Sequence, residues 1–242
     1  MVQEGLKSLL LGIVQGITEW LPISSTGHLL LLDEVMHLSL GEDARELFFV
    51  IIQLASILAV VILYFSTLNP FSKAKRPEEK RETYLLWVKV LIATIPAGVV
   101  GLLIDDLMDT YLYKWWVVAA ALFAYGLLYI ILERGRWGKR EIRVHELSEI
   151  SYRDAVSLGF FQMLALIPGT SRSGSTILGG IIIGLERQVA AKFSFFMAIP
   201  VMAGASLLKL IKLGFNYTTE EYLLIAIGFG SSFLVSLFCI KA

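Results

Sequence analysis

The sequence QGITEWLPISSTGH, at residues 15–28, interrupts an apolar stretch that runs from residue 8 to residue 32. A second apolar stretch, residues 155–185, is interrupted in the same way by PGTSRSGST at residues 168–176. Each half of either stretch has about 10–14 residues, which is too short to cross a bilayer core of about 30 Å as a helix. Irregular backbone at membrane depth survives only where protein buries it or where it lines a wet cavity. The two breaks therefore predict two re-entrant helix-loop-helix hairpins.

The composition indicates an integral membrane protein. Of the 242 residues, 56% are hydrophobic and 17% are charged, with a mean hydropathy of +0.71, whereas a soluble globular domain has about 45–50% apolar residues. The formal net charge of zero excludes the basic surface that is typical of a nucleic-acid-binding protein. The one cysteine, Cys239, excludes an intrachain disulfide. Glu4 precedes the first apolar run and polar residues interrupt that run, so we expect no cleaved signal peptide.

Five further segments are long and apolar enough to cross a bilayer as helices, which takes about 20 residues. They are residues 47–66, 87–104, 115–132, 193–213 and 222–240. We therefore predict an all-α integral membrane protein with five transmembrane helices and two re-entrant hairpins, formed by residues 1–242 as a single membrane domain.

The basic loops set the expected orientation. Loops 70–89 and 133–153 each carry six lysine or arginine residues, whereas loops 33–46 and 105–114 carry one each. Because cytoplasmic loops are rich in these residues, we expect the two basic loops inside. The first hairpin then enters from the outer side and the second from the cytoplasm. The alternative, in which both broken stretches cross the bilayer completely, stays open, and hairpins are the preferred prediction.

An internal repeat relates the two halves of the sequence. The pattern Leu-Gly-x-x-Gln occurs at residues 11–15 and again at residues 158–162, 147 positions later, and the same offset relates residues 44–49 to residues 191–196. Three predicted spans separate the two hairpins, so the repeat has inverted topology, an arrangement that places a site near the midplane where the halves meet. We expect the repeats at about residues 1–110 and about residues 150–242.

The second break has the residues of an anion site. Glycines 169 and 174 allow backbone N–H groups at a helix N-terminus to approach a phosphate closely, and Arg172 adds a planar, permanently charged fork for phosphate oxygens. A nucleotide-binding loop requires lysine where Ser175 stands, which excludes an NTPase. A helix-packing turn of small residues is the alternative, and it does not explain the arginine. The candidate substrate contacts are Gly169, Thr170, Ser171, Ser173 and Gly174.

The first break offers oxygen ligands for a metal ion. Gln15 and Glu19 are four residues apart, so they share a helix face. Both present hard oxygens, and Mg²⁺ or Ca²⁺ bridging them to a phosphate is the predicted cofactor. The alternative is that Glu19 simply pairs with Arg172.

Side chains with hydroxyl and imidazole groups come after Glu19 in the first break. Ser24, Ser25 and Thr26 lie beside the turn, where any of them could attack phosphorus, position a water or bind substrate. For two of the three, a helix cap is the preferred interpretation. His28 lies one turn into the next half-helix, as a general acid/base or nucleophile or, alternatively, as a hydrogen-bonded core residue.

Together, residues 15–28 and 168–174 resemble the signature of the undecaprenyl-diphosphate phosphatase family of the bacitracin-resistance type, and the resemblance covers nearly the whole chain. It implies hydrolysis of undecaprenyl diphosphate to undecaprenyl phosphate and inorganic phosphate, which recycles the carrier lipid for cell-wall synthesis. It also implies dependence on a divalent cation, and a multi-pass protein of the bacterial inner (plasma) membrane whose site opens toward the outer side. The expected partners are the polyprenyl diphosphate lipid and membrane lipid, with a homodimer as one option for assembly.

The resemblance assigns roles to individual residues. Gln15 and Glu19 match the acidic pair of the family, Ser25 and His28 its catalytic serine and histidine, and Arg172 its pyrophosphate-binding arginine. The first acidic position of the family is often Glu, so the neutral Gln15 leaves Glu19 as the one charged metal ligand on that face. The resemblance also implies a sixth transmembrane helix, whereas the sequence shows five.

Two other functions were weighed. A flippase or transporter of a phosphorylated lipid fits the inverted repeat. The other type of membrane acid phosphatase needs a histidine downstream of its Ser-Arg element, and none follows Arg172, which excludes it.

Overall fold

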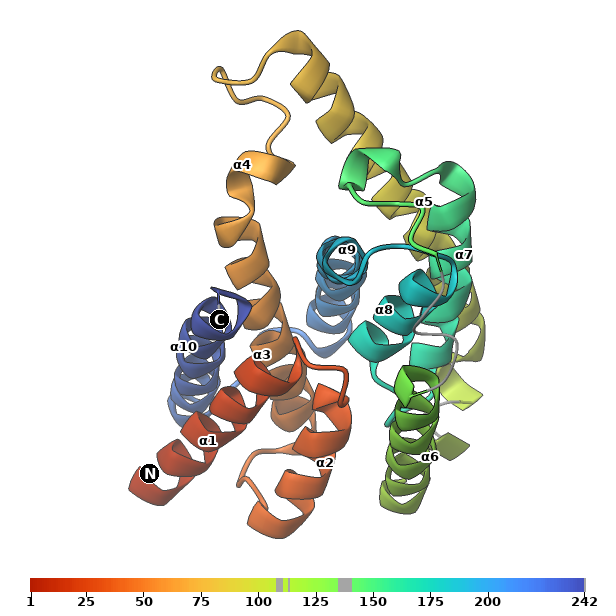
Figure 1. The fold of residues 1–242 in the computed structure, drawn as a ribbon. Helices are drawn as coiled ribbons and strands as arrows, with labels where there is room; N and C mark the ends of the chain where they lie inside the picture. The colour runs from red at the N-terminus through yellow and green to blue at the C-terminus, as the bar shows by residue number, and fades with distance from the viewer. Residues whose placement is uncertain (108–110, 113, 135–140, 242) are drawn as a thin grey trace. The chain divides into compact units, whose positions relative to one another are not determined.

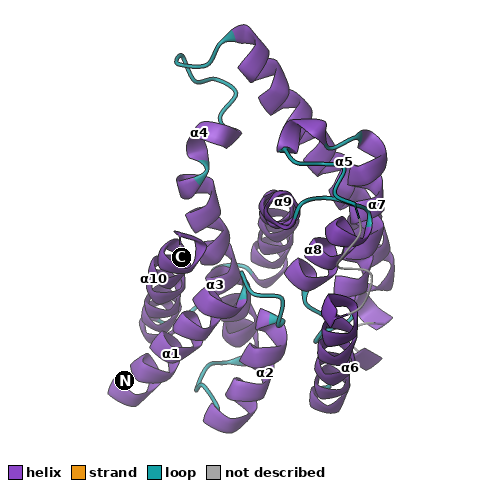
Figure 2. Cartoon of the chain, viewed as in Figure 1, coloured by secondary structure: helices purple, strands orange, loops and turns teal. Residues whose placement is uncertain are grey.

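The computed structural model describes residues 1–107, 111–112, 114–134 and 141–241 (Figure 1). Parts of the predicted loops 105–114 and 133–153 therefore lie outside the described residues. Within the described residues the chain forms helices joined by loops (Figure 2). One isolated bridge pairs Val144 with Leu185. The α-helices are α1 (Val2–Thr18), α2 (Ser25–Met36), α3 (Glu42–Leu63), α4 (Phe65–Leu68), α5 (Pro77–Leu107), α6 (Trp115–Arg134), α7 (Tyr152–Met163), α8 (Arg172–Ile182), α9 (Arg187–Leu213) and α10 (Thr219–Lys241), and the 3₁₀ turns are η3 (Leu147–Glu149) and η4 (Leu164–Leu166).

Four helices of the described chain are long and apolar enough to cross a membrane, which confirms the all-helical prediction and agrees with an integral membrane protein. They are Glu42–Leu63, Pro77–Ile104, Arg187–Leu213 and Thr219–Lys241. The remaining predicted span falls in α6, whose apolar stretch, Trp115–Ile131, is shorter.

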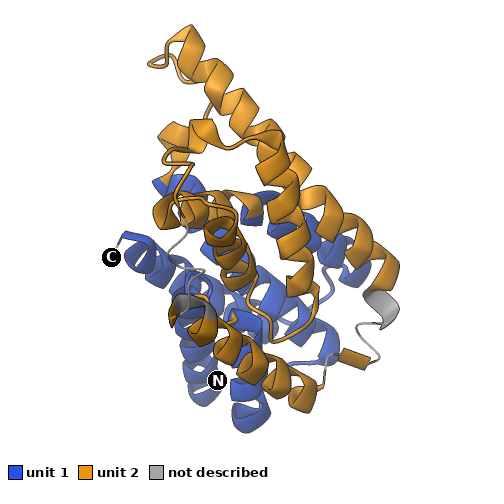
Figure 3. Cartoon of the chain, turned by 45° about the vertical axis from the view of Figure 1, so that its right-hand side comes forward, with its two compact units in different colours: residues 1–21, 25–63, 198–242 blue, residues 22–24, 64–197 orange. Residues whose placement is uncertain are grey.

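The chain divides into two compact units (Figure 3), each described by itself. Unit 1 comprises Met1–Leu21, Ser25–Leu63 and Ala198–Ala242, and unit 2 comprises Pro22–Ser24 and Tyr64–Met197. The helix α9 contributes to both. In unit 1, large side chains of α1, α2, α3 and α10 form one buried core, with Leu11, Leu29, Phe48, Ile52 and Ile225 among its members. Burial of this apolar surface holds the helices of the unit together.

Close contact between α1 and α10 in unit 1 depends on small residues. A Cβ atom built on Gly12 would lie 2.5 Å from the carbonyl oxygen of Gly228, so only glycine fits at this position. Ser8 Oγ donates a hydrogen bond of 2.6 Å to the carbonyl oxygen of Leu224 on α10. Small residues and interhelical hydrogen bonds are the usual means of packing helices that share a lipid environment.

Unit 2 repeats this packing with α7 and α5. A Cβ atom built on Gly159 would lie 2.6 Å from the carbonyl oxygen of Ala93, so α7 and α5 approach as closely as α1 and α10 do. Gly12 and Gly159 are the two glycines of the repeated Leu-Gly-x-x-Gln pattern. Each therefore packs on a helix that belongs to the other predicted repeat.

The N-terminus of α7 is fixed by a capping box. Ser151 Oγ accepts a hydrogen bond from the backbone N–H of Asp154, and the Asp154 side chain accepts one from the N–H of Ser151. Asp154 is 4% exposed and also forms an ion pair with Arg143. Burial on its own would raise the pKa of Asp154, but hydrogen bonds from Arg143 and Ser151 outweigh it and leave this pKa lowered.

Both predicted breaks are present. The first lies between α1 and α2, and the second lies between α7 and α8, with the 3₁₀ turn η4 inside it. The helix-break-helix pattern that the sequence predicts is thus confirmed at both places.

Candidate functional site

The first break begins where α1 ends. The backbone N–H of Glu19 donates to the carbonyl oxygen of Gln15, which closes the last turn of the helix. Ser24 has a φ of 63°, in the left-handed region that a side chain rarely adopts. Such backbone costs on the order of 1–3 kcal/mol, and it is concentrated at functional sites. The chain then enters α2 at Ser25.

Three buried polar side chains of unit 1 converge at this break. Ser25 Oγ donates a hydrogen bond of 2.6 Å to Glu19 Oε2, and Gln15 Nε2 donates one of 3.0 Å to the same oxygen. The exposed fractions are 0% for Gln15, 4% for Glu19 and 8% for Ser25. A hydroxyl that donates to a buried carboxylate is aligned to give up its proton when it attacks an electrophile.

Two further predicted residues lie on the first turn of α2. Thr26 and His28 are both partly buried. His28 is three residues after Ser25, so the two side chains share a face of α2. The structure thus brings Gln15, Glu19 and Ser25 into direct contact and places His28 on the adjoining helix turn.

The second break is a capped helix N-terminus in unit 2. Gly169 has a φ of 95°, a conformation that favours glycine. Ser171 is the N-cap of α8, and its Oγ accepts a hydrogen bond of 3.0 Å from the backbone N–H of Gly174. Ser171 Oγ and Ser173 Oγ are 3.1 Å apart, and both residues are buried. The Thr170 hydroxyl donates back to the carbonyl oxygen of Ile167.

Arg172 is the first residue of α8. Its Nη1 donates a hydrogen bond of 3.0 Å to the carbonyl oxygen of Ser194 on α9. Thr176 Oγ1 and Ser194 Oγ are 2.6 Å apart, so the same segment of α9 supports the first two turns of α8. The guanidinium is therefore tethered at the positive end of a helix, where an anion is favoured.

One contact inside unit 2 joins the two predicted motifs. The segment Pro22–Ser24 belongs to this unit, and the carbonyl oxygen of Pro22 lies 3.3 Å from the position of a Cβ atom built on Gly174. The turn of the first break therefore packs on the first turn of α8. Glu19 and Arg172 lie in different units, so their predicted proximity stays a prediction.

Comparisons with known proteins show the family of the chain. The family model described as bacitracin resistance protein BacA matches residues 8–242. The chain belongs to the BacA family. It is 52% identical over 239 residues to the undecaprenyl-diphosphatase of Desulfitobacterium hafniense, and 50% identical over 238 residues to undecaprenyl-diphosphatase 1 of Clostridioides difficile. It is also 48% identical over 240 residues to the undecaprenyl-diphosphatase of Enterococcus faecalis. These alignments cover 98% of this chain and 86–87% of each relative.

The site of this BacA-family protein has oxygen atoms that fit a divalent cation. Gln15 Oε1 is buried and has no hydrogen-bond partner among the described residues, and it lies next to the Glu19 carboxylate. No group of three or more His, Cys, Asp or Glu side chains in the described part of the chain could hold a metal ion by itself. The residues therefore fit a cation that completes its ligands with phosphate oxygens or water, as Mg²⁺ commonly does.

Three residues that support the site were missed by the sequence analysis. Ser56 on α3 contacts Gln15, Ser194 on α9 holds Arg172, and the Tyr125 hydroxyl on α6 donates 2.7 Å to Ser175 Oγ. Each is a polar side chain within an apolar helix. Because a polar group at membrane depth is costly, the sequence could have marked these residues, although it does not identify their partners.

Proposed function

We propose that the protein hydrolyses undecaprenyl diphosphate to undecaprenyl phosphate and inorganic phosphate in the bacterial membrane, and so recycles the lipid carrier for cell-wall synthesis. Relatives that bear the name undecaprenyl-diphosphatase align with 98% of the chain, which supports this substrate. The structural observation that carries the proposal is the 2.6 Å hydrogen bond from Ser25 to Glu19, buried at a helix break.

The reaction uses Ser25 as the nucleophile. Its Oγ attacks the terminal phosphorus while its proton passes to Glu19 Oε2. The bond from that phosphorus to the bridging oxygen breaks, and undecaprenyl phosphate leaves. A water then attacks the phosphoserine, and the bond from phosphorus to Ser25 Oγ breaks. The proton held by Glu19 returns to that oxygen, which releases inorganic phosphate and restores the Ser25 hydroxyl. His28 takes the proton of that water, since it lies on the same face of α2.

The second break binds the diphosphate. The N-terminus of α8 and the guanidinium of Arg172 supply positive charge, which is the main means of stabilising a transferring phosphoryl group. The small residues of the break let the backbone approach the phosphate oxygens. The substrate contacts in this proposal are Ser24, Thr26, Gly169, Thr170, Ser171, Ser173 and Gly174.

Gln15 and Glu19 are the proposed ligands of a divalent cation, Mg²⁺ or Ca²⁺. Gln15 Oε1 supports this assignment, because it is a buried acceptor with no hydrogen-bond donor among the described residues and a bound cation would satisfy it. When bound, the cation would neutralise negative charge on the diphosphate. Gln15 also fixes the Glu19 carboxylate by its 3.0 Å hydrogen bond.

For the arrangement in the membrane, we propose the one that the sequence predicts. We place both breaks at the tips of re-entrant hairpins, between five transmembrane helices in two inverted repeats, with the site open to the outer face of the inner membrane. The reciprocal packing of Gly12 on α10 and of Gly159 on α5 supports the repeat. The short helices α2 and α8, of 12 and 11 residues, support re-entrance, since neither could cross a bilayer alone. A homodimer is the assembly to test by mass measurement in detergent.

Phosphate release from a polyprenyl diphosphate by the purified protein tests the function. We expect Arg172→Ala to abolish release and Arg172→Lys to restore only part of it, because lysine keeps the charge and loses the planar fork. Lys192→Ala, which removes an exposed charge from α9, is the matched control. Near wild-type release by Arg172→Ala would show that the site is wrong. Transport of labelled polyprenyl phosphate across liposomes without phosphate release would favour the flippase instead.

A further inference from the structure

A chain of buried serine hydroxyls in unit 1 ends at the side-chain amide of Gln15. Ser232 Oγ on α10 donates to the carbonyl oxygen of Ile52 at 2.7 Å, which commits its one hydrogen. Ser56 Oγ lies 2.9 Å from Ser232 Oγ and 3.5 Å from the carbonyl oxygen of Ile52, so its one hydrogen is directed to these acceptors. Ser236 Oγ donates 3.0 Å to Ser56 Oγ. With its own hydrogen committed, Ser56 can only accept at its contact with Gln15 Nε2, 3.5 Å away. The side chains of Gln15, Ser56 and Ser232 are fully buried.

This direction of hydrogen bonding sets the orientation of the amide. One N–H of Gln15 points to Glu19 Oε2 and the other to Ser56 Oγ. Both amide hydrogens are then used, and Oε1 is turned away from both partners with no hydrogen bond among the described residues. If the amide rotated by half a turn, Oε1 would face the Glu19 carboxylate. The two oxygens are both acceptors, so no hydrogen bond could form between them.

We infer that Ser56 and Ser232 are positioning residues of the site, which hold the Gln15 amide so that its Oε1 faces the ligand. The inference rests on the proposed function and deepens it. The serines reach no reacting atom themselves. They act through Gln15, as outer partners act through the ligands that they orient.

The test compares serine-to-alanine variants in detergent. We expect Ser56→Ala to lower kcat about tenfold or more with a smaller change in KM, the usual cost of removing such an outer partner. Ser206→Ala is the matched control, since Ser206 is 2% exposed on α9 and takes no part in the described side-chain hydrogen bonds of Gln15 and Ser56. In a Gln15→Ala background, Ser56→Ala should add less than about twofold, because positioning residues and their target are not additive. Additive losses would overturn the inference.

A second readout separates this inference from the proposed reaction. Mg²⁺ or Ca²⁺ should raise the melting midpoint of the wild type. Ser56→Ala and Ser232→Ala should each require a higher cation concentration for half of this effect. Ser206→Ala should require the same concentration as the wild type. If the wild type releases no phosphate yet shows this pattern, the function fails and the positioning role stands. If Ser56→Ala and Ser232→Ala both match the wild type, the positioning role is wrong.

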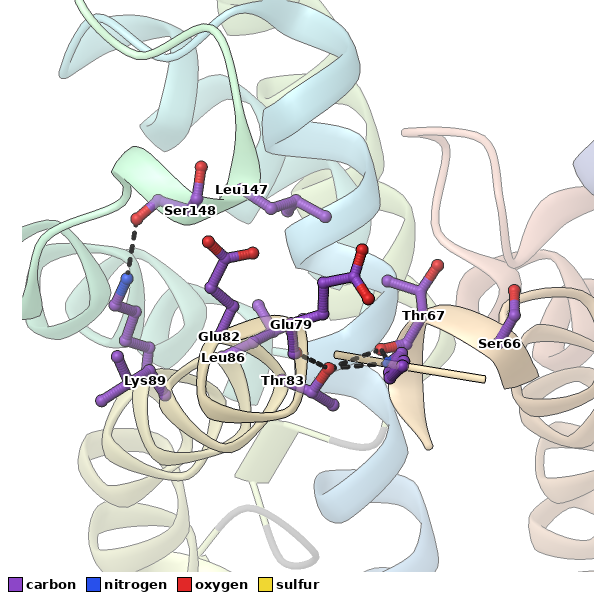
Figure 4. A pocket seen from close by; sticks show the side chains of 11 residues that line it. Ser66, Thr67, Glu79, Glu82, Thr83, Leu86, Lys89, Leu147 and Ser148 are labelled. Carbon is purple, nitrogen blue, oxygen red and sulfur yellow. Dashed lines mark hydrogen bonds between the residues drawn. The ribbon is translucent and has the colours of Figure 1, made fainter. Parts of the chain in front are cut away.

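A separate observation concerns a pocket of about 470 Å³ in unit 2, distant in sequence from both breaks (Figure 4). Its walls come from α4, from Lys75 in the loop before α5, from the first half of α5 and from η3. Lys89 is 8% exposed, and its Nζ donates 3.1 Å to the carbonyl oxygen of Ser148. The charges of Asp154 and Glu82 both act on this ammonium. Figure 4 shows Glu82 on the same helix, with its carboxylate toward the η3 side.

Aromatic side chains lie on α5 and on the loop before it, the segments that also line the pocket. The rings of Phe71 and Tyr84 meet edge to face, 6.2 Å apart, and both side chains are exposed. Trp87 Nε1 donates 2.8 Å to the carbonyl oxygen of Leu68, which ties α4 to α5. Exposed aromatic rings beside a basic loop mark a membrane–water interface.

We propose that this pocket binds the headgroup of a zwitterionic aminophospholipid. Lys89 receives the phosphate and Glu82 the ammonium. The two residues are seven apart on α5, two turns or about 10.5 Å along the axis, so their long side chains can hold the two ends of one headgroup. The opposite charges at one pocket disfavour a purely anionic headgroup.

Melting midpoints in detergent with added lipid test the pocket. Phosphatidylethanolamine should raise the midpoint of the wild type more than phosphatidylglycerol does, and Glu82→Gln should remove the difference. Glu78→Gln, an exposed change in the first turn of α5, is the control that should keep it. Equal stabilisation by the two lipids, or a difference that survives in Glu82→Gln, would overturn the proposal. A larger effect of inorganic phosphate than of either lipid would assign the pocket to a soluble anion.

Discussion

The two breaks are built from similar residues and have different chemistry. The first holds a buried carboxylate, a hydroxyl that donates to it and a turn with left-handed backbone at Ser24. The second holds a capped helix N-terminus, a tethered arginine and no carboxylate among its described residues 167–176. In the proposed reaction, one break supplies proton transfer and attack, and the other supplies positive charge. The helices before the two breaks nevertheless pack in the same way, with Gly12 against α10 and Gly159 against α5.

The largest expected effect comes from removing the base of the first break. Glu19→Gln keeps the shape and the hydrogen-bonding reach of the side chain but cannot accept the Ser25 proton. Loss of a general base costs about 10²–10⁴-fold, so we expect kcat to fall about 10³-fold with a melting midpoint close to wild type. Phosphate release and thermal unfolding measured on one preparation check this.

The matched variant for Glu19→Gln changes a carboxylate outside the breaks. Glu42→Gln, in the first turn of α3, should leave kcat unchanged. If Glu19→Gln retains more than about a tenth of wild-type kcat, Glu19 is not the base.

The close helix packing at Gly12 and at Gly159 predicts that a larger residue at either position lowers the stability of the protein. Gly12→Ala and Gly159→Ala each place a Cβ atom about 2.5–2.6 Å from a backbone carbonyl oxygen, so the helices must separate. Overpacking of this kind costs up to about 3 kcal/mol. Thermal unfolding in detergent should show a clear loss for both variants.

Gly230→Ala and Gly98→Ala are the controls, because a Cβ atom at either position has nothing within 4 Å. In a helix interior this change should stabilise by about 0.5–1 kcal/mol. A loss of stability in only one of Gly12→Ala and Gly159→Ala would contradict the predicted repeat, which requires a loss in both.

The stability contributed at the N-terminus of α7 should be sensitive to acid. The pKa of Asp154 is lowered in the folded protein, so its contribution to stability is complete above its unfolded pKa of about 4 and is lost as pH falls through the folded value. Asp154→Asn removes an ion pair with Arg143 and should cost about 2 kcal/mol at neutral pH. The difference in melting midpoint between wild type and Asp154→Asn should shrink below about pH 4. A constant difference from pH 7 to pH 3 would contradict this.

The sequence predicted the two helix-break-helix segments because proline, glycine and serine interrupt apolar runs there. It also predicted that Gln15 and Glu19 share a face, which follows from helix geometry alone. It could not predict Ser56, Ser232 or Ser194 as partners of the site. Those contacts depend on which helices lie side by side, and a single serine in an apolar helix carries no information about its neighbour.

The smallest expected effect is at the cap of the second break. Ser171→Ala removes the side-chain acceptor for the N–H of Gly174 and should cost about 1 kcal/mol of stability. Ser171→Asp, which keeps a capping oxygen, should restore the stability but weaken binding of a diphosphate by adding a negative charge. Thermal unfolding and KM measured together check both parts. Full affinity in Ser171→Asp would mean that the diphosphate does not approach this helix end.

The central claim is that both breaks hold one diphosphate. An experimental structure with a methylene-bridged polyprenyl diphosphate, which cannot be cleaved, measures this directly. We predict that the Arg172 guanidinium contacts the phosphate oxygens of the same molecule whose terminal phosphorus lies opposite Ser25 Oγ, at about 3–3.5 Å. A bound diphosphate that contacts only one of the two breaks would contradict the account.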